Sequence, residues 1–279
     1  MQTEANTKEL IYLYAFVPTN ETKENSLSSM TGIDPDYDIE FIEFNEVTAV
    51  TCLVKEEDFS EEVLQRKVDD MKWLQKHAFH HHEKMNALNE IYTVIPLKFG
   101  TIYEDKESLK EIVETHKENI TSVFKELGKK EEWNIKIYTD KSSFTKEVEE
   151  NSTTVKEKIE EIKDLPKGKQ FFEKKKLKDF IEKQAEKEID EYCESIHEQL
   201  TAYSSDEEVK KNWERKLTGR KDDMCWNGAY LFPKEEVERA LQIIETEREK
   251  ADKNETGFSY EVTGPWPAYH FSNFTERGE

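Results

Sequence analysis

The chain has 279 residues, a length that suits one large domain or two ordinary ones, and 37% of its residues are charged. Its formal net charge of −21 would repel nucleic acid phosphates and an anionic membrane surface, so we expect neither as a partner. The cysteines Cys52, Cys193 and Cys225 form no CxxC pair, which favours buried, reduced thiols over a zinc ribbon or a disulfide scaffold.

The first half of the chain predicts an α+β domain, to which we assign residues 1–130. Apolar residues alternate with polar ones in its β-rich runs, and they recur at three, four or seven residues in its helical runs. The predicted elements are a strand at 9–18, paired strands within 38–54, one long helix from Phe59 to Leu88, a β-rich run at 92–103 and a helix from about Asp105 to Leu127.

The second half predicts the element order β, α, β, β, α, β. This is the split βαβ pattern of a ferredoxin-like fold, modified here by helices inserted after the first strand. We assign it to residues 131–263 and expect the tail, residues 264–279, to pack between the two domains. The predicted elements are a strand at 133–140, short helices within 141–170, a long helix at 171–203, a hairpin of 209–217 and 224–232, a helix from Pro233 to about Lys250 and a strand at 257–266.

A histidine cluster, HAFHHHEK, occupies residues 77–84 of the predicted long helix. His77 and His81 are four residues apart and share a helix face, a spacing that can bind a metal ion. The local sequence supplies no third ligand and does not match HExxH. We expect one or both of His81 and His82 to border the core and form hydrogen bonds, with His77 and His80 in solvent. A metal-binding enzyme that uses the His77/His81 cluster is the alternative function.

Other catalytic patterns are missing from the sequence. It contains no GxSxG motif and no glycine-rich phosphate loop among its nine glycines, so we expect no catalytic residue, no cofactor and no small-molecule substrate. The glycines of FGTIY (99–103) and NGAYLF (227–232) lie in β-rich runs, where glycine usually marks a bulge or a close backbone approach. We therefore expect both to be packing features.

The stretch TGPWPAYHFS, residues 263–272, carries no formal charge when its histidine is neutral. Each proline restricts itself and the residue before it, which gives Trp266, Tyr269 and Phe271 defined directions and a large area to bury. The segment either folds back on the chain or forms an exposed docking surface. We expect the first, so Trp266→Ala should lower the free energy of unfolding by about 3–5 kcal/mol.

Three motifs, in this order and at these separations, resemble those of the gas vesicle protein L/F family: VIPLKFGTIY (94–103), NGAYLF (227–232) and TGPWPAYHF (263–271). HEKMNAL (82–88) and EEWNIKIYTD (131–140) also fit the family pattern. Lys98, Gly228 and Ala268 depart mildly from it and leave the choice between the L and F branches open. The candidate interaction residues that these motifs supply are His82, Pro96, Phe99, Gly100, Thr101, Trp133, Gly264, Pro265, Trp266, Pro267, Tyr269 and Phe271.

The resemblance implies an accessory or minor structural protein and not an enzyme. Such a protein would assist assembly of the gas-filled shell through contacts with the small hydrophobic shell protein and with other gas vesicle proteins. It would be cytoplasmic before assembly and located at the gas vesicle afterwards. The family also implies two α+β domains, the second of them modified ferredoxin-like. A general acidic scaffold unrelated to vesicles is a further alternative, and the oligomeric state stays open.

Overall fold

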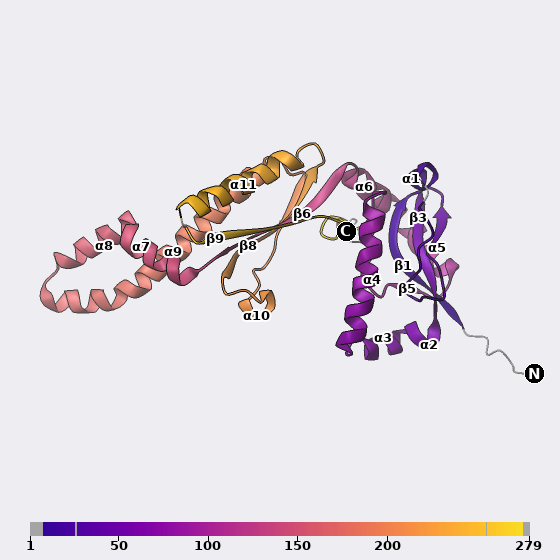
Figure 1. The fold of residues 1–279 in the computed structure, drawn as a ribbon, viewed down its shortest axis with the longest axis horizontal. Coiled ribbons are helices and arrows are strands. Elements are labelled where there is room, and N and C mark those ends of the chain that lie inside the picture. Colours follow the sequence, from indigo (N-terminus) through magenta and orange to yellow (C-terminus); the bar gives the residue numbers. More distant parts are fainter. Residues whose placement is uncertain (1–7, 26, 255, 276–279) are drawn as a thin grey trace, which may run out of the picture. The chain divides into compact units, whose positions relative to one another are not determined.

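The computed structural model describes residues 8–25, 27–254 and 256–275. The chain divides into two compact units, Met1–Glu131 together with Pro265–Glu279, and Glu132–Gly264. Each unit contains its own sheet and its own helices, so the expected mixture of strands and helices is confirmed (Figure 1). In the described part of the chain, no helix combines the length and the apolar character that crossing a membrane requires.

The sheet of the first unit has the strand order β2-β3-β1-β4, and β5 also pairs with β1. All its pairings are antiparallel, and β1 pairs with β3 along its whole length. Because β1 lies inside the sheet and is buried from its second residue onward, it reads as a continuous apolar run. Its strands are β1 (Glu9–Pro18), β2 (Glu40–Phe44), β3 (Val47–Lys55), β4 (Ile95–Pro96) and β5 (Ile102–Tyr103).

The helices of the first unit are shorter than the sequence pattern predicts. The single helix expected from Phe59 to Leu88 is wrong, because the chain is extended at Ser60 and again at Asp70. The carboxylate of Asp70 accepts hydrogen bonds from two backbone N–H groups of the next turn and so caps a new helix. The helices are α1 (Thr19–Glu24), α2 (Glu56–Phe59), α3 (Glu61–Lys67), α4 (Met71–Asn89), α5 (Lys106–Thr115) and α6 (Lys117–Leu127).

Two further predictions for this unit need correction. The helix expected from Asp105 to Leu127 is interrupted at His116, which leaves helical geometry and separates α5 from α6. The stretch after Pro18, to which the sequence pattern assigns neither a strand nor a helix, contains the short helix α1. Neither change alters the pattern of buried residues on which the predictions rested.

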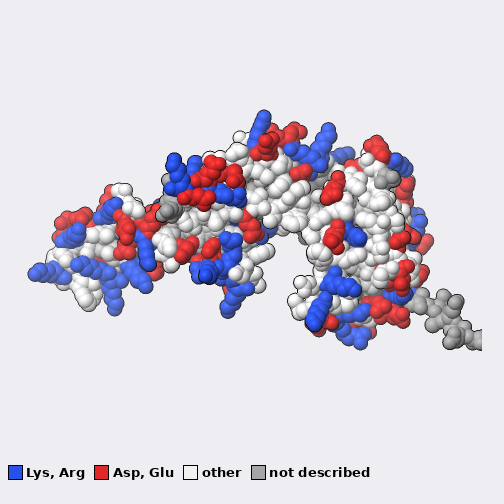
Figure 2. Space-filling model, in the orientation of Figure 1, with Lys and Arg blue, Asp and Glu red and all other residues white. Residues whose placement is uncertain are grey.

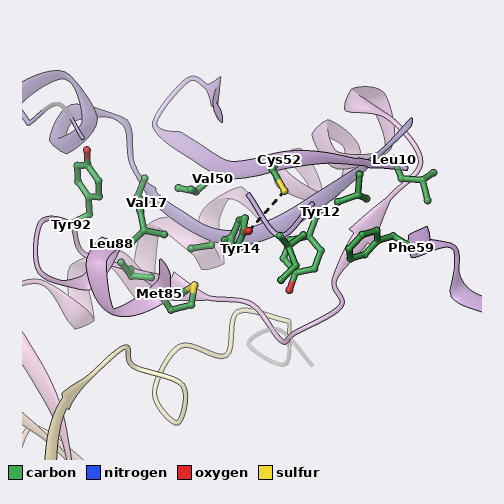
Figure 3. Packing of buried hydrophobic residues seen from close by; sticks show 14 residues of the cluster. Leu10, Tyr12, Tyr14, Val17, Val50, Cys52, Phe59, Met85, Leu88 and Tyr92 are labelled. Atoms are coloured by element: carbon green, nitrogen blue, oxygen red, sulfur yellow. Dashed lines mark hydrogen bonds between the residues drawn. The ribbon is translucent and has the colours of Figure 1, made fainter. Parts of the chain in front are cut away.

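The core of the first unit lies between the sheet and α4 (Figure 3). Tyr12 and Tyr14 of β1 are fully buried and meet Met85 and Leu88 of α4. The Cys52 thiol donates a weak hydrogen bond to the Tyr14 hydroxyl at 3.9 Å, and burial raises the pKa of this thiol. Cys52 is therefore an inert core residue, as the sequence predicts for an isolated cysteine.

The sheet of the second unit has the strand order β7-β8-β6-β9. The predicted strand at 209–217 is wrong: β7 ends at Val209, and the chain then forms a short helix closed by Gly219 in the left-handed conformation. The elements of this unit are β6 (Lys130–Thr139), α7 (Lys141–Asn151), α8 (Thr153–Lys163), α9 (Lys167–Thr201), β7 (Asp206–Val209), α10 (Arg215–Thr218), β8 (Asp223–Pro233), α11 (Val237–Asn254) and β9 (Phe258–Trp266).

Helix α9 is 35 residues long and takes part in two separate clusters of buried side chains. Its second half, from Ile189 to Leu200, packs in the main core with β6, β8 and α11. Its first half lies alongside α7 and α8, where Ile181 and Ala185 meet Val148 and Val155 (Figure 1). Half of this helix therefore depends on a small local cluster and not on the core of the sheet.

Candidate interaction surface

The candidate residues fall into two groups in the structure. Trp133 and Gly264 lie together in the second unit. The remaining ten belong to the first unit, although they come from the middle and from the end of the chain. They are His82, Pro96, Phe99, Gly100, Thr101, Pro265, Trp266, Pro267, Tyr269 and Phe271.

The C-terminal segment is held in the first unit by its phenylalanines. Phe271 and Phe274 are both buried, and the Phe274 ring lies 5.7 Å from that of Phe16 on β1. The side-chain amide of Asn119 donates a hydrogen bond of 3.0 Å to the Phe274 carbonyl oxygen. Sequence reasoning missed Phe274, although its position three residues after Phe271 was a usable signal. These contacts bury the far end of the segment more deeply than its tryptophan.

Trp266 packs against its own chain, as expected, but it is half-buried and not a fully buried core residue. Its ring lies 5.2 Å from the imidazole of His82 on α4, and the side-chain amide of Asn86 donates to His82 Nε2 at 3.2 Å. This contact joins the last motif of the sequence to the histidine cluster. Because Trp266 is less buried than Phe271, we expect its removal to cost less than removal of Phe271.

Helix α4 carries exposed apolar side chains on the side of this contact. Met71 is 71% exposed and Phe79 is 62% exposed. At the helical rotation of about 100° per residue, Met71, Phe79 and His82 fall within about 80° of one another around the helix axis. We call Met71, Phe79, His82 and Trp266 the α4 surface. Exposed apolar groups gathered in this way are typical of protein–protein contact sites.

Behind this surface lies a buried polar link between the histidine cluster and FGTIY. The Tyr12 hydroxyl oxygen accepts a hydrogen bond of 3.2 Å from the Gly100 backbone N–H. The same hydroxyl lies 2.8 Å from His81 Nδ1, to which it can donate its proton. Gly100 has a φ of +84°, a conformation that favours glycine. Burial lowers the pKa of His81 to about 4, against an opposing effect of the Leu97 backbone, so the imidazole is neutral at pH 7.

In the part of the chain that the structure describes, the metal alternative finds no ligand set. His77 stacks on Trp73 with ring centroids 4.0 Å apart, and its Nδ1 lies 2.7 Å from the Trp73 carbonyl oxygen. The expectation that His77 and His80 face solvent is wrong, because both are half-buried. Within residues 8–25, 27–254 and 256–275, no three histidine, cysteine or acidic side chains form a group that could hold a metal ion.

The glycines of the other motifs have packing roles in the second unit. Gly264 has a φ of +148°, and a Cβ there would lie 2.8 Å from the Trp133 ring and 2.9 Å from the Glu132 carbonyl oxygen. A Cβ on Gly228 would lie 2.7 Å from the Tyr230 ring. Both positions require a residue without a side chain because an aromatic ring occupies the space.

A groove of about 640 Å³ opens beside Gly100 in the first unit, and we call it the Gly100 groove. It runs between the start of β1, the α2–α3 segment and residues 99–104. Its lining combines apolar side chains with charged groups, a combination suited to an amphipathic occupant. The apolar lining includes Leu10, Phe59, Leu64, Val68, Phe99 and Ile102, and the charged groups are Lys8, Glu56, Glu61 and Glu104.

Comparison with known proteins gives consistent matches over almost the whole chain. A family model described as "Gas vesicle synthesis protein GvpL/GvpF" matches residues 10–273. Gas vesicle protein L of Streptomyces sp. (strain CB03234) is 21% identical over 272 residues, which cover 97% of this chain and 96% of that protein.

Two crystal structures share the fold. Gas vesicle protein GvpF from Anabaena sp. PCC7120 superposes with a TM-score of 0.70 at 17% identity, covering 95% of this chain and 98% of that one. Gas vesicle protein GvpF from Microcystis aeruginosa superposes with a TM-score of 0.62 at 16% identity, covering 95% of this chain and 99% of that one.

Proposed function

Because this chain belongs to the gas vesicle synthesis protein GvpL/GvpF family, we propose that it is an accessory or minor structural protein that assists assembly of the gas vesicle shell. The match over residues 10–273 confirms the resemblance that its motifs showed, and it is the observation that carries the proposal. The family is one of gas vesicle proteins, which gives no support to an enzymatic activity.

The proposed activity is the binding of the small hydrophobic shell protein and of other gas vesicle proteins. A very hydrophobic subunit exposes apolar surface to water before it is assembled, and this exposure drives aggregation. A bound partner with a net charge of −21 would keep such a complex dispersed through electrostatic repulsion. The protein would act in the cytoplasm before assembly and at the gas vesicle afterwards, without a cofactor.

The α4 surface supports this proposal at the level of residues. Phe79 exposes a large apolar side chain within one helical turn of His82, whose contact with Trp266 joins two of the family motifs, and Met71 exposes another about three turns away on the same side of α4. These side chains bury little apolar area on folding, whereas they would gain apolar burial against a hydrophobic partner. We therefore assign shell protein binding to this surface.

Co-expression with the shell protein tests the assignment. In the variant Met71→Ser/Phe79→Ser, we expect the chain to fold as the wild type does and to retain much less shell protein in the soluble fraction. Leu217→Ser is the matched control, because Leu217 is 75% exposed in the second unit. Equal retention by both variants would refute the assignment to α4. A wild-type chain that retains no shell protein would refute direct subunit binding altogether.

We also propose that the second unit is a modified ferredoxin-like domain. In chain order, β6, β7, β8 and β9 are the first to fourth strands of this unit. Their order in the sheet, β7-β8-β6-β9, is therefore second, third, first, fourth, which is the order of a ferredoxin-like sheet. Helices α7 and α8 are the inserted helices. Side chains of α9 and α11 share one buried cluster, which supports their packing on the same face of the sheet. An experimental structure with these helices on opposite faces would contradict this proposal.

A further inference from the structure

The connection between α8 and α9 has a charge opposite to that of the rest of the chain. Residues 163–178, which we call the basic tip, contain seven lysines and two carboxylates, a formal charge of +5 in a chain whose net charge is −21. Figure 2 shows lysine side chains gathered over this end of the helices. A local positive charge of this size in an acidic protein indicates a contact with an acidic surface.

The basic tip also exposes two adjacent aromatic rings. Phe171 is 70% exposed and Phe172 is 66% exposed, and their rings lie edge to face with centroids 5.8 Å apart. The next apolar residues of α9, Leu177 and Phe180, pack against α7 and α8 instead. The pair therefore forms an apolar point flanked by lysines, without a role in the described core. An acidic surface that also offers an apolar hollow would match it.

The first unit of the same chain offers such a surface at the Gly100 groove. The α2–α3 segment that forms one side of the groove, residues 56–70, contains seven carboxylates and two basic residues, a formal charge of −5. The lining also includes apolar side chains, and the volume of about 640 Å³ lies in the range of pockets that enclose a small ligand. Two phenyl rings are smaller than such a ligand, so the groove has room for the side chains of Phe171 and Phe172.

We propose that the basic tip of one copy of this chain docks into the Gly100 groove of a second copy. Phe171 and Phe172 would enter the apolar lining, while tip lysines would pair with carboxylates of residues 56–70. An anionic membrane fits less well, because the remainder of the chain is strongly acidic and would be repelled. This inference goes beyond the proposed function and does not depend on which protein the α4 surface binds.

The symmetry of this contact predicts the form of the assembly. The tip and the groove are different patches, so each copy that offers its groove still has a free tip. Such a heterologous contact leads to a ring where its rotation closes and to an open array where it does not. Its affinity should fall with added salt, because the contact combines exposed charges with a small apolar area.

Sedimentation velocity of the untagged full chain tests the proposal over a rising protein concentration. We expect the mean mass to rise with concentration at low salt and to rise less at high salt. Phe171→Ser/Phe172→Ser and, separately, Lys169→Glu/Lys174→Glu/Lys175→Glu should abolish the rise. All five side chains are exposed, so the variants are expected to fold.

A matched control and a charge exchange separate this contact from a general charge effect. The control, Lys125→Glu/Lys141→Glu/Lys146→Glu, makes the same change in net charge at exposed positions outside the tip. Its mean mass should still rise with protein concentration. The groove variant Glu57→Lys/Glu61→Lys/Glu62→Lys should not associate alone, yet it should form mixed complexes with the lysine-reversed tip variant.

Three results would overturn the proposal. The wild type could stay monomeric at every concentration, the tip variants could associate as the control does, or the two charge-reversed variants could fail to form mixed complexes.

Flotation with vesicles of equal parts phosphatidylserine and phosphatidylcholine tests binding to a lipid surface. Lysine-dependent binding to these vesicles by a chain that does not self-associate would assign the tip to a lipid surface instead.

Discussion

Gly264 is the residue at which two family motifs meet in the second unit. Its φ of +148° and the nearness of the Trp133 ring leave no room for a side chain. We expect Gly264→Ala to lower the free energy of unfolding of this unit by about 1–3 kcal/mol, the usual cost of a strained backbone conformation. Urea unfolding followed by circular dichroism measures the change.

Gly168 is the matched control for this substitution. It lies in the first turn of α9, and a Cβ there would meet no atom within 4 Å. Gly168→Ala should therefore leave stability unchanged or raise it by up to about 1 kcal/mol, because alanine loses less backbone freedom on folding. If both alanines had the same effect, the Trp133 contact would not explain the glycine.

His81 predicts a pH dependence of stability with a definite sign. Its pKa falls from the ordinary value of 6.5 to about 4 on folding, chiefly because the ring is buried. Above pH 6.5 the imidazole is neutral in both states and the full stability is present. As the pH falls from 6.5 to 4, only the unfolded chain binds this proton, so stability is lost, by about 3 kcal/mol in total.

The variant His81→Gln isolates this contribution. Glutamine keeps an acceptor for the Tyr12 hydroxyl but does not titrate, so its unfolding free energy should change less between pH 6.5 and pH 4. The comparison uses urea unfolding of both chains at a series of pH values. The wild type and the variant contain the same carboxylates, so the difference between their profiles reports on His81. Parallel plots of unfolding free energy against pH would show that His81 does not titrate as described.

At the scale of elements, local patterns predicted the strands better than the helix ends. The alternation within 38–54 correctly places β2 and β3 on either side of a turn at Asn45, which adopts a left-handed conformation. The long apolar stripe did not reveal the breaks at Ser60 and Asp70. A helical period continues across a capped break, so periodicity alone cannot detect one.

The α7–α8–α9 extension should open more easily than the sheet of the same unit. Among the described residues, its cluster comprises the buried side chains of Val148, Val155, Ile181 and Ala185, whereas the second half of α9 packs in the larger core. Local stability follows the number of buried apolar contacts. In hydrogen exchange with mass spectrometry, amides of α7, α8 and residues 167–186 should exchange well before those of residues 189–200.

Val155→Ala sharpens this prediction. The side chain is fully buried in the small cluster, and we expect its truncation to accelerate exchange in α7, α8 and the first half of α9 only. The amides of β6 and β8 serve as the internal control. Acceleration across the whole second unit would mean that the extension and the sheet unfold together.

At the scale of the whole molecule, the end of the chain belongs to the first unit although it follows the second in sequence. Removal of residues 265–279 should therefore destabilise the first unit and spare the second. The truncation removes two buried phenylalanines, Phe271 and Phe274, and core phenylalanines typically contribute about 3–5 kcal/mol each.

The three free cysteines report on the two units separately. Cys52 is buried in the first unit, and Cys193 and Cys225 are buried in the second. In the truncated chain, thiol labelling at increasing urea should modify Cys52 at a lower concentration than in the full chain, with the other two unchanged. Earlier labelling of all three thiols would show that the segment stabilises the molecule as a whole.

The sequence by itself determined the features that depend on neighbouring residues. Alternation predicted the main strands, the 3.6-residue period predicted α9 and α11, and the motif order identified the family. Composition also predicted that the cysteines are unpaired, and the structure finds all three free. These properties are local or compositional, so they can be read without knowing which segments meet.

Only the tertiary structure decided which candidate residues lie together. It placed Trp266 against His82, buried Phe271 and Phe274 in the first unit, and assigned Gly264 and Trp133 to the second unit. It also showed the Gly100 groove and the exposed phenylalanines of the basic tip. Burial and contact depend on residues far apart in the chain, and a local pattern carries no information about which distant segment supplies the partner.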